Sequence, residues 1–185
     1  VADQFGIGAA KAARRALKKD GFDLIHDRAY PVDLQDMHAI MTEVKQLNPD
    51  SLVAFSYPPD TIMITEQARA VGFNPKVFYT AIGTAFPLYK QRFGADVEGV
   101  MGLGGWNADA PESKAYLQRH VELAGKEPDR WASPITYASL QMLQQAIERA
   151  GRIDRAAVIK ELQTGTFETI LGSVKLENNL FTENW

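Results

Sequence analysis

The sequence predicts an α/β protein in which a parallel sheet is flanked by helices. Helix-like and strand-like segments alternate along its first part. The strand-like segments begin near residues 23, 51, 76 and 98, so successive strands start 28, 25 and 22 residues apart. That spacing is typical of βα units, which build parallel sheets covered by helices. The segment 51–57 is also a nearly continuous apolar run, as expected for a strand buried on both faces.

The first elements follow from helix start and stop signals. Residues 6–19 are rich in alanine, lysine and arginine and predict a helix that ends at Gly21. Its basic residues Arg14, Arg15, Lys18 and Lys19 are interpreted as a solvated face. A short strand is predicted at 22–28. Asp33 is expected to cap a helix that runs to about Leu47. One stripe of this helix is apolar and comprises Leu34, Met37, Ile40, Met41, Val44 and Leu47.

The next elements complete the predicted sheet. The turn Asn48-Pro49-Asp50 precedes the strand 51–57, and Pro58-Pro59-Asp60 then leads into a helix that ends at Gly72. A strand is expected at 76–81. It is followed by a short helix over Thr84 to Phe93 and a last strand over Glu98 to Leu103.

The second part of the chain is mainly helical. Helices are predicted at 110–123, with Pro111 in the first turn, and from Ser133-Pro134 to Ala150. Asp154 is expected to cap a third helix that ends near Gly165, and a strand is predicted at 173–176. The glycine-rich stretch 102–107 is interpreted as a connection between two lobes.

Composition excludes several classes of protein. The 185 residues are 45% hydrophobic, 10% aromatic and 23% charged, which are ordinary globular values. The net charge of −3 argues against nucleic-acid binding, which favours a clustered basic face. Apolar runs are far shorter than the roughly 20 residues of a membrane-spanning helix. The absence of cysteine excludes disulfides and thiolate metal sites, and it is compatible with an oxidising compartment.

No catalytic, metal or cofactor site is predicted. Gly6-Ile7-Gly8 resembles the start of a dinucleotide fingerprint, but Lys11 occupies the third glycine position, so close packing at a helix start is the favoured interpretation. The histidines His26, His38 and His120 share no metal-ligand spacing. Paired carboxylates lie at loops and helix starts, where capping explains them.

A ligand site is expected at the carboxyl ends of the strands, where open α/β sheets bind their ligands. Tyr57 ends one strand just before a helix start, and Thr80 to Thr84 follow the next strand. A phenol, free backbone amides and a helix start suit a small polar or anionic ligand. The alternative, that Tyr57 only packs at the edge of the sheet, is equally compatible with the sequence.

Short motifs over nearly the whole chain resemble one family, the periplasmic substrate-binding proteins of branched-chain amino acid ABC transporters, of the Leu/Ile/Val-binding type. Their order and spacing carry the resemblance more than any single motif does. They are Asp3-Gln4-Phe5-Gly6, Tyr30-Pro31-Val32-Asp33-Leu34-Gln35-Asp36, Leu47-Asn48-Pro49-Asp50, Gln67-Ala68-Arg69-Ala70-Val71-Gly72, Glu98-Gly99-Val100, Thr136-Tyr137-Ala138, Ala146-Ile147-Glu148-Arg149-Ala150-Gly151 and Thr169-Ile170-Leu171-Gly172-Ser173-Val174.

The resemblance implies a type I periplasmic-binding fold of two lobes, present here as a fragment. Residues 1–102 correspond to most of the second ligand-binding lobe without its first strand, and 103–109 to an interlobe connection. Residues 110–170 correspond to helices of the first lobe. Residues 171–185 correspond to the third crossover and the start of the return to the second lobe.

The resemblance also implies ligand-binding residues. They are Phe5, Tyr57, Thr80, Ala81, Ile82 and Gly83. Amino-acid binders of the family place an acid for the ligand ammonium in the loop that corresponds to 80–83, and this loop has none. A buried ammonium without a counter-charge costs several kcal/mol, so an apolar or aromatic carboxylate is expected to bind more tightly than leucine, isoleucine or valine.

The expected function is therefore the solute-binding component of an ABC importer. It is a protein without enzymatic activity, cofactor or metal, and it holds a small amino-acid-like or apolar or aromatic carboxylate ligand in an interlobe cleft. A membrane permease is the implied partner. The implied location is periplasmic or extracellular, and no signal peptide is visible in this chain. The alternatives are a ligand-sensing regulatory or receptor domain of the same fold and, less favoured, a dinucleotide-binding enzyme.

Overall fold

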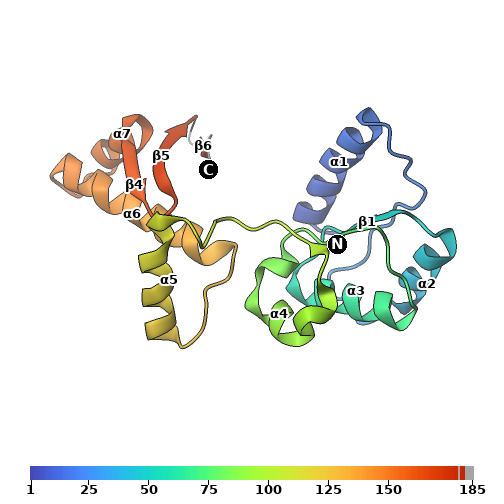
Figure 1. Cartoon of the computed structure of the whole chain (residues 1–185). Helices are drawn as coiled ribbons and strands as arrows, with labels where there is room; N and C mark the ends of the chain where they lie inside the picture. Colours follow the sequence, from blue (N-terminus) through green and yellow to red (C-terminus); the bar gives the residue numbers. More distant parts are fainter. Residues whose placement is uncertain (179, 182–185) are drawn as a thin grey trace. The chain divides into compact units, whose positions relative to one another are not determined.

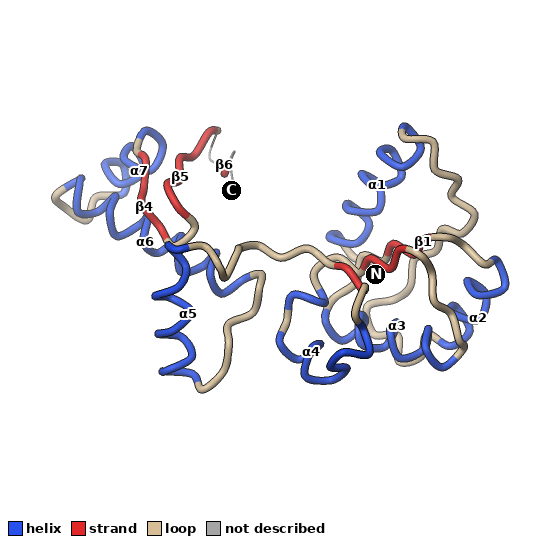
Figure 2. Tube along the Cα trace, viewed as in Figure 1, coloured by secondary structure: helices blue, strands red, loops and turns tan. Residues whose placement is uncertain are grey.

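The computed structural model describes residues 1–178, 180 and 181, and the chain divides into two compact units, 1–103 and 104–185. Each unit has its own sheet and its own apolar core (Figures 1 and 2). The boundary falls inside the glycine-rich stretch 102–107. Within the described part of the chain, no helix has the length and apolar character needed to cross a membrane.

The sheet of the first unit is parallel, as the spacing of its strands predicts. It consists of β1 (Ser51–Val53), β2 (Val77–Tyr79) and β3 (Val100–Met101), in the order β1-β2-β3. Leu52 lies opposite Phe78 in the first ladder, and Phe78 lies opposite Val100 in the second. All three carboxyl ends therefore point to the same edge.

Helices surround this sheet. They are α1 (Gln4–Lys19), α2 (His38–Leu47), α3 (Pro58–Ala70) and α4 (Pro87–Phe93), with the short 3₁₀ helices η1 (Gly83–Ala85) and η2 (Gly94–Val97). Met41 and Val44 of α2 pack with Ile64 and Ala68 of α3 and with Phe78 of β2 in one buried cluster. Burial of these apolar side chains is the main force that holds α2 and α3 to the sheet.

Two predictions about strands are wrong. Residues 22–28 form no strand, and Phe22, Leu24 and Ile25 are 57%, 43% and 47% exposed. A strand exists only where a ladder partner is present, and in the described structure the sheet ends at β1. The same open edge leaves Val53 37% exposed, so the run 51–57 is not buried on both faces.

Two helix starts also differ from the prediction. Helix α2 begins at His38, whose N–H donates to Asp36 Oδ1 at 2.8 Å, and not after Asp33. Leu34 and Met37 still pack into the core without helical backbone, so their apolar spacing was misleading. The predicted helix 84–93 is split, because Phe86 precedes a proline and takes extended backbone (φ −100°, ψ 134°).

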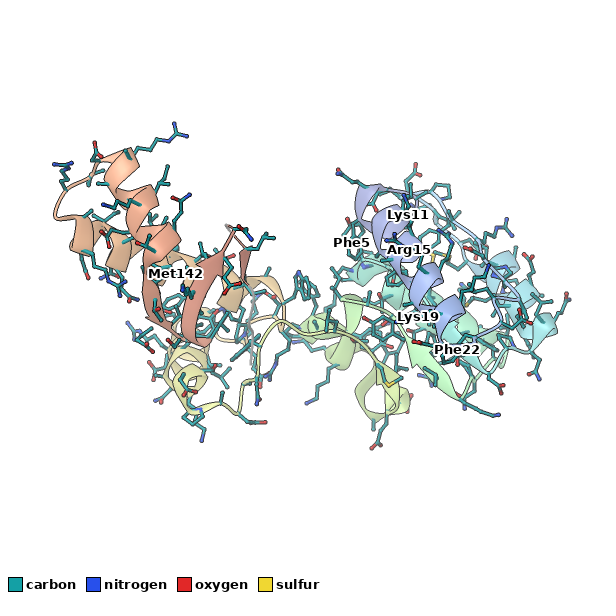
Figure 3. The ribbon with its side chains drawn as sticks, turned by 90° about the horizontal axis from the view of Figure 1, so that it is seen from above. Phe5, Lys11, Arg15, Lys19, Phe22 and Met142 are labelled. Atoms are coloured by element: carbon teal, nitrogen blue, oxygen red, sulfur yellow. The ribbon has the colours of Figure 1, made fainter. Side chains whose placement is uncertain are left out.

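The second unit contains three helices and a small antiparallel sheet. The elements are α5 (Pro111–Ala124), α6 (Ala132–Ala150), α7 (Arg155–Thr164), β4 (Thr166–Thr169), β5 (Gly172–Glu177) and β6 (Leu180–Phe181). The predicted helices are confirmed, and Asp154 caps α7 as expected, accepting the N–H of Ala157 at 2.8 Å. The strand at 173–176 is confirmed within β5, whereas β4 was not predicted. Met142 of α6, labelled in Figure 3, lies in the buried core with Phe167 of β4.

Candidate functional site

The sequence-predicted binding residues lie at the carboxyl edge of the β1-β2-β3 sheet. Tyr57 is the last residue before α3, and Thr80 to Gly83 follow β2 directly. Phe5 lies in the first turn of α1 (Figure 3), and its ring centroid is 5.3 Å from that of Tyr57 at an interplanar angle of 36°. The structure therefore brings Phe5 and Tyr57 together, although they are far apart in the sequence.

Asp3 forms hydrogen bonds both to Tyr57 and to the first turn of α1, which carries Phe5. Tyr57 Oη donates to Asp3 Oδ2 at 2.7 Å, and Asp3 Oδ1 accepts the N–H of Gly6 at 2.7 Å. The second contact caps the start of α1. Asp3 therefore fixes the first turn of the helix, which carries Phe5, against the phenol of Tyr57.

These contacts set the charges at the site. The backbone hydrogen bond from Gly6, followed by the one from the Tyr57 hydroxyl, holds the pKa of Asp3 below its usual value. The hydrogen bond to Asp3 in turn raises the pKa of Tyr57. At neutral pH, Asp3 is therefore an anion and Tyr57 is a neutral donor.

A second carboxylate lies under the same residue. Asp60 is 7% exposed, and its Oδ2 accepts the N–H of Tyr57 and the hydroxyl of Tyr30, both at 3.3 Å. Burial, and then the charge of Asp60, raise the pKa of Tyr30, which stays a protonated donor. Helix α3 begins with Pro58-Pro59, and a proline has no N–H to offer. Neither Pro58 nor Pro59 therefore offers an N–H to an anionic ligand at this helix start.

The loop 80–83 is held by hydrogen bonds to Met101 of β3 and to Leu103, which follows β3. Thr80 is fully buried, and both its N–H and its hydroxyl donate to the carbonyl of Met101, at 2.9 and 3.4 Å. Ala81 has a positive φ of 51° and accepts the N–H of Leu103 at 2.7 Å. Among the four loop residues, Thr80, Ala81 and Gly83 are buried and Ile82 is partly exposed. Ile82 is thus the loop side chain that a ligand reaches most readily.

A buried chain of hydroxyl groups supports this loop. Ser56 Oγ lies 2.7 Å from Thr61 Oγ1 and donates to the carbonyl of Thr80 at 3.3 Å. Thr65 donates to the carbonyl of Thr61 at 2.8 Å, and its hydroxyl lies 2.9 Å from that of Tyr89. These hydroxyl contacts link the segment after β1 to α3, to α4 and to the loop after β2. Sequence reasoning missed them, although hydroxyl residues on the inner face of α3 were a visible signal.

The three histidines and Gly6 make the ordinary structural contacts that the sequence analysis favoured for them. His26 lies 3.6 Å from Glu43, His38 contacts Gln67, and His120 contacts the carbonyl of Lys126. Over the described residues, no group of three or more potential metal ligands gathers. A Cβ on Gly6 would lie 2.0 Å from the carbonyl oxygen of Val1, which is the close packing predicted for this glycine.

Comparison with known proteins identifies the architecture. A family model described as periplasmic binding protein matches residues 1–183, nearly the whole chain. The chain belongs to the periplasmic binding protein family. Members of this family bind solutes without catalysing a reaction, in agreement with the absence of enzymatic activity expected from the sequence.

Curated relatives of this periplasmic binding protein are distant and longer. The Leu/Ile/Val/Thr-binding protein of Salmonella typhimurium is 25% identical over 169 residues, which is 91% of this chain and 46% of the relative. The Leu/Ile/Val-binding protein of Escherichia coli K12 is also 25% identical, with 45% of it covered. The chain thus spans about half the length of the curated relatives it matches.

Solved structures agree on the fold. The leucine-binding protein LivK of Thermotoga maritima matches with a TM-score of 0.82 and 25% identity, over 96% of this chain and 51% of that one. An amino acid ABC transporter substrate-binding protein of Pseudomonas fluorescens matches with a TM-score of 0.81 and 20% identity, over 95% and 48%. The second match supports the fold alone.

Proposed function

We propose that this chain provides part of the solute-binding component of an ABC importer, and that it binds a small amino-acid-like ligand with an apolar side chain. The observation that carries the proposal is the pair Phe5–Tyr57, hydrogen-bonded to the ionised Asp3 at the carboxyl edge of the sheet. Membership of the periplasmic binding protein family supports a membrane permease as partner and a periplasmic or extracellular location.

Each part of the site has a role in this proposal. The rings of Phe5 and Tyr57 cover the apolar side chain of the ligand, and Ile82 extends the apolar surface. The carboxylate of Asp3 attracts the ligand ammonium, with Asp60 beneath Tyr57 as a second negative charge. The sequence favoured a ligand without an ammonium because the loop 80–83 lacks an acid. Asp3 and Asp60 supply that charge from neighbouring elements.

A second candidate ligand is an apolar or aromatic carboxylate without an ammonium group. The acid-free loop Thr80–Gly83 supports it, as does the aromatic character of Phe5 and Tyr57. The two candidates differ in one chemical group, so matched pairs of ligands separate them.

Calorimetric titration of the 185-residue chain compares leucine with 4-methylpentanoate, and phenylalanine with 3-phenylpropanoate. We expect the amino acid of each pair to bind about tenfold more tightly or better, because the ammonium meets a carboxylate. Asp3→Asn should remove most of that preference while it preserves the helix cap, since asparagine caps as well as aspartate. Tighter binding of the simple carboxylates would favour the second candidate, and no binding of any of the four contradicts the proposal.

Tyr57→Ala tests the position of the site. Loss of the ring and the hydroxyl should weaken the tighter ligand about tenfold or more. The control is Tyr137→Ala, which truncates a 47% exposed tyrosine of the second unit, and it should leave affinity unchanged. Equal affinities for the two variants would exclude Tyr57 from the site.

A further inference from the structure

We propose that helix α1 carries a docking surface for anionic lipid headgroups. This surface, called the basic face, consists of Lys11, Arg15, Lys18 and Lys19. Among the residues of α1, only Phe5 in the first turn contributes a side chain to the ligand site proposed above. The basic face and the ligand site are therefore tested independently of one another.

The basic face runs along one side of the helix. Lys11, Arg15 and Lys19 are spaced four residues apart, so they lie on the same side, about 6 Å apart along the helix axis (Figure 3). Lys18 follows Arg15 by three residues and shares that side. All four residues are exposed, so the whole basic face is open to solvent.

The opposite side of α1 is the side that packs. Gly6 is buried, and Ala13 and Leu17 are partly buried. These residues are seven and four positions apart, which places them on one side of the helix. The basic face therefore points away from the side on which α1 packs.

The charges of this chain are segregated. Helix α1 carries five of the 20 lysines and arginines and none of the 23 acids, so the remainder of the chain holds 15 basic residues against 23 acidic ones. Every other helix of ten or more residues carries both signs of charge, as ordinary solvated surfaces do. The basic face is thus a local reversal of the charge of the chain.

The cations of the basic face have no internal partners. Arg92 of α4 pairs with Glu66 at 2.6 Å, and Arg14 of α1 pairs with Asp27 at 2.5 Å. Over the described residues, none of the four cations of the basic face lies within 4.0 Å of a carboxylate oxygen. Their charges are therefore available to an external anion.

The helix dipole explains only part of this pattern. Lys18 and Lys19 lie in the last turn of α1, where cations stabilise the carboxyl end of a helix. That effect is confined to the last turn, so it does not account for Lys11 and Arg15. The two cations in the middle of the helix indicate a partner outside the chain.

The surroundings of the basic face favour a lipid surface as that partner. Ala12 and Ala16, which lie between the cations, are exposed and small, so they allow the helix to approach a flat surface closely. Ile7, one turn before the first cation, and Phe22, three residues beyond the last, are 54% and 57% exposed. Helices that lie in a bilayer interface combine such apolar residues with clustered lysine and arginine, and four or more of these cations suffice to bind anionic lipids.

Vesicle cosedimentation of the 185-residue chain tests the proposal. The two probes are vesicles of phosphatidylcholine alone and vesicles of phosphatidylcholine and phosphatidylglycerol in equal parts. Each lysine or arginine near an anionic surface strengthens binding about fivefold, so we expect the anionic vesicles to bind about 100-fold more tightly or better. Salt at about 1 M should remove most of this preference, because it shortens the range of charge interactions to about 3 Å.

A pair of double variants makes the test specific for the basic face. Lys11→Gln with Arg15→Gln should weaken binding to the anionic vesicles about 25-fold, while glutamine preserves the helix propensity of α1. The control is Lys114→Gln with Arg119→Gln, which removes the same charge from exposed positions of α5 and should leave vesicle binding unchanged. Circular dichroism of both variants checks that their helices are intact.

Three outcomes overturn the proposal. The first is equal binding to neutral and anionic vesicles, and the second is an equal loss of binding for the two double variants. The third is a lack of binding to either kind of vesicle. In that case, retention on immobilised polyglutamate that is lost with Lys11→Gln and Arg15→Gln would assign the basic face to an acidic protein instead.

Discussion

Gly83 has no space for a side chain. A Cβ at this position would lie 1.8 Å from Thr61 Oγ1, and Thr61 is fully buried and hydrogen-bonded to Ser56. At the scale of single residues, the candidate site therefore depends on close packing beneath its loop. The same loop holds Ala81 in left-handed backbone, which a residue with a side chain rarely adopts.

Gly83→Ala should lower the free energy of unfolding by about 1–3 kcal/mol, because the added methyl group overpacks a buried contact. The control is Gly8→Ala in α1, where no atom lies within 4 Å of the new Cβ. That change should raise stability by about 0.5–1 kcal/mol through the better helix propensity of alanine. Urea unfolding measures both, and a Gly83→Ala variant as stable as the parent chain would contradict the packing argument.

Asp3 should make stability depend on acid pH. Its folded-state pKa is lowered, so its contribution is present above its unfolded pKa and is lost as the pH falls through the lower folded value. Carboxyl NMR titration should place the pKa of Asp3 below 3.8. Tyr57→Phe should raise it only partly, since the larger cause, the bond from Gly6, remains. A pKa of Asp3 at or above its ordinary value in the parent chain would contradict this explanation.

At the scale of elements, local signals predicted most helices correctly. Asp154 caps α7, Gly125 and Gly151 take left-handed backbone where α5 and α6 end, and each was recognised from sequence alone. Predictions failed where an element depends on a distant partner. The segment 22–28 has strand composition without a ladder partner, and Asp33 precedes apolar residues that pack without a helix.

Asp154 and Asp33 give a matched test, because the first caps a helix and the second precedes residues that pack without one. Asp154→Ala should cost about 1 kcal/mol, because the N–H of Ala157 loses its cap. Asp33→Ala should change stability by less than about 0.5 kcal/mol, since α2 begins at His38 and not after Asp33. Thermal unfolding of both variants checks the prediction. Equal losses of stability would indicate that Asp33 caps a longer helix α2.

At the scale of the whole molecule, the sequence predicted the class of fold and part of the site. Strand spacing indicated a parallel sheet, the carboxyl-edge rule selected Tyr57, and the family resemblance added Phe5, whose ring lies beside that of Tyr57. Asp3 and Asp60 were missed, because a carboxylate at a helix start has an ordinary explanation as a cap. Only the hydrogen bonds of Asp3 and Asp60 to Tyr57 show that both carboxylates also lie beside this residue.

The most direct test of the central claim is an NMR titration of the 185-residue chain with leucine or phenylalanine, whichever binds more tightly. We expect the largest backbone shift changes to fall on Asp3, Phe5, Tyr57 and the loop 80–83, with little change in α7 and β5. Asp3→Asn should reduce these changes at equal ligand concentration. Shift changes confined to the second unit, or a response unaltered by Asp3→Asn, would contradict a ligand site at this edge of the sheet.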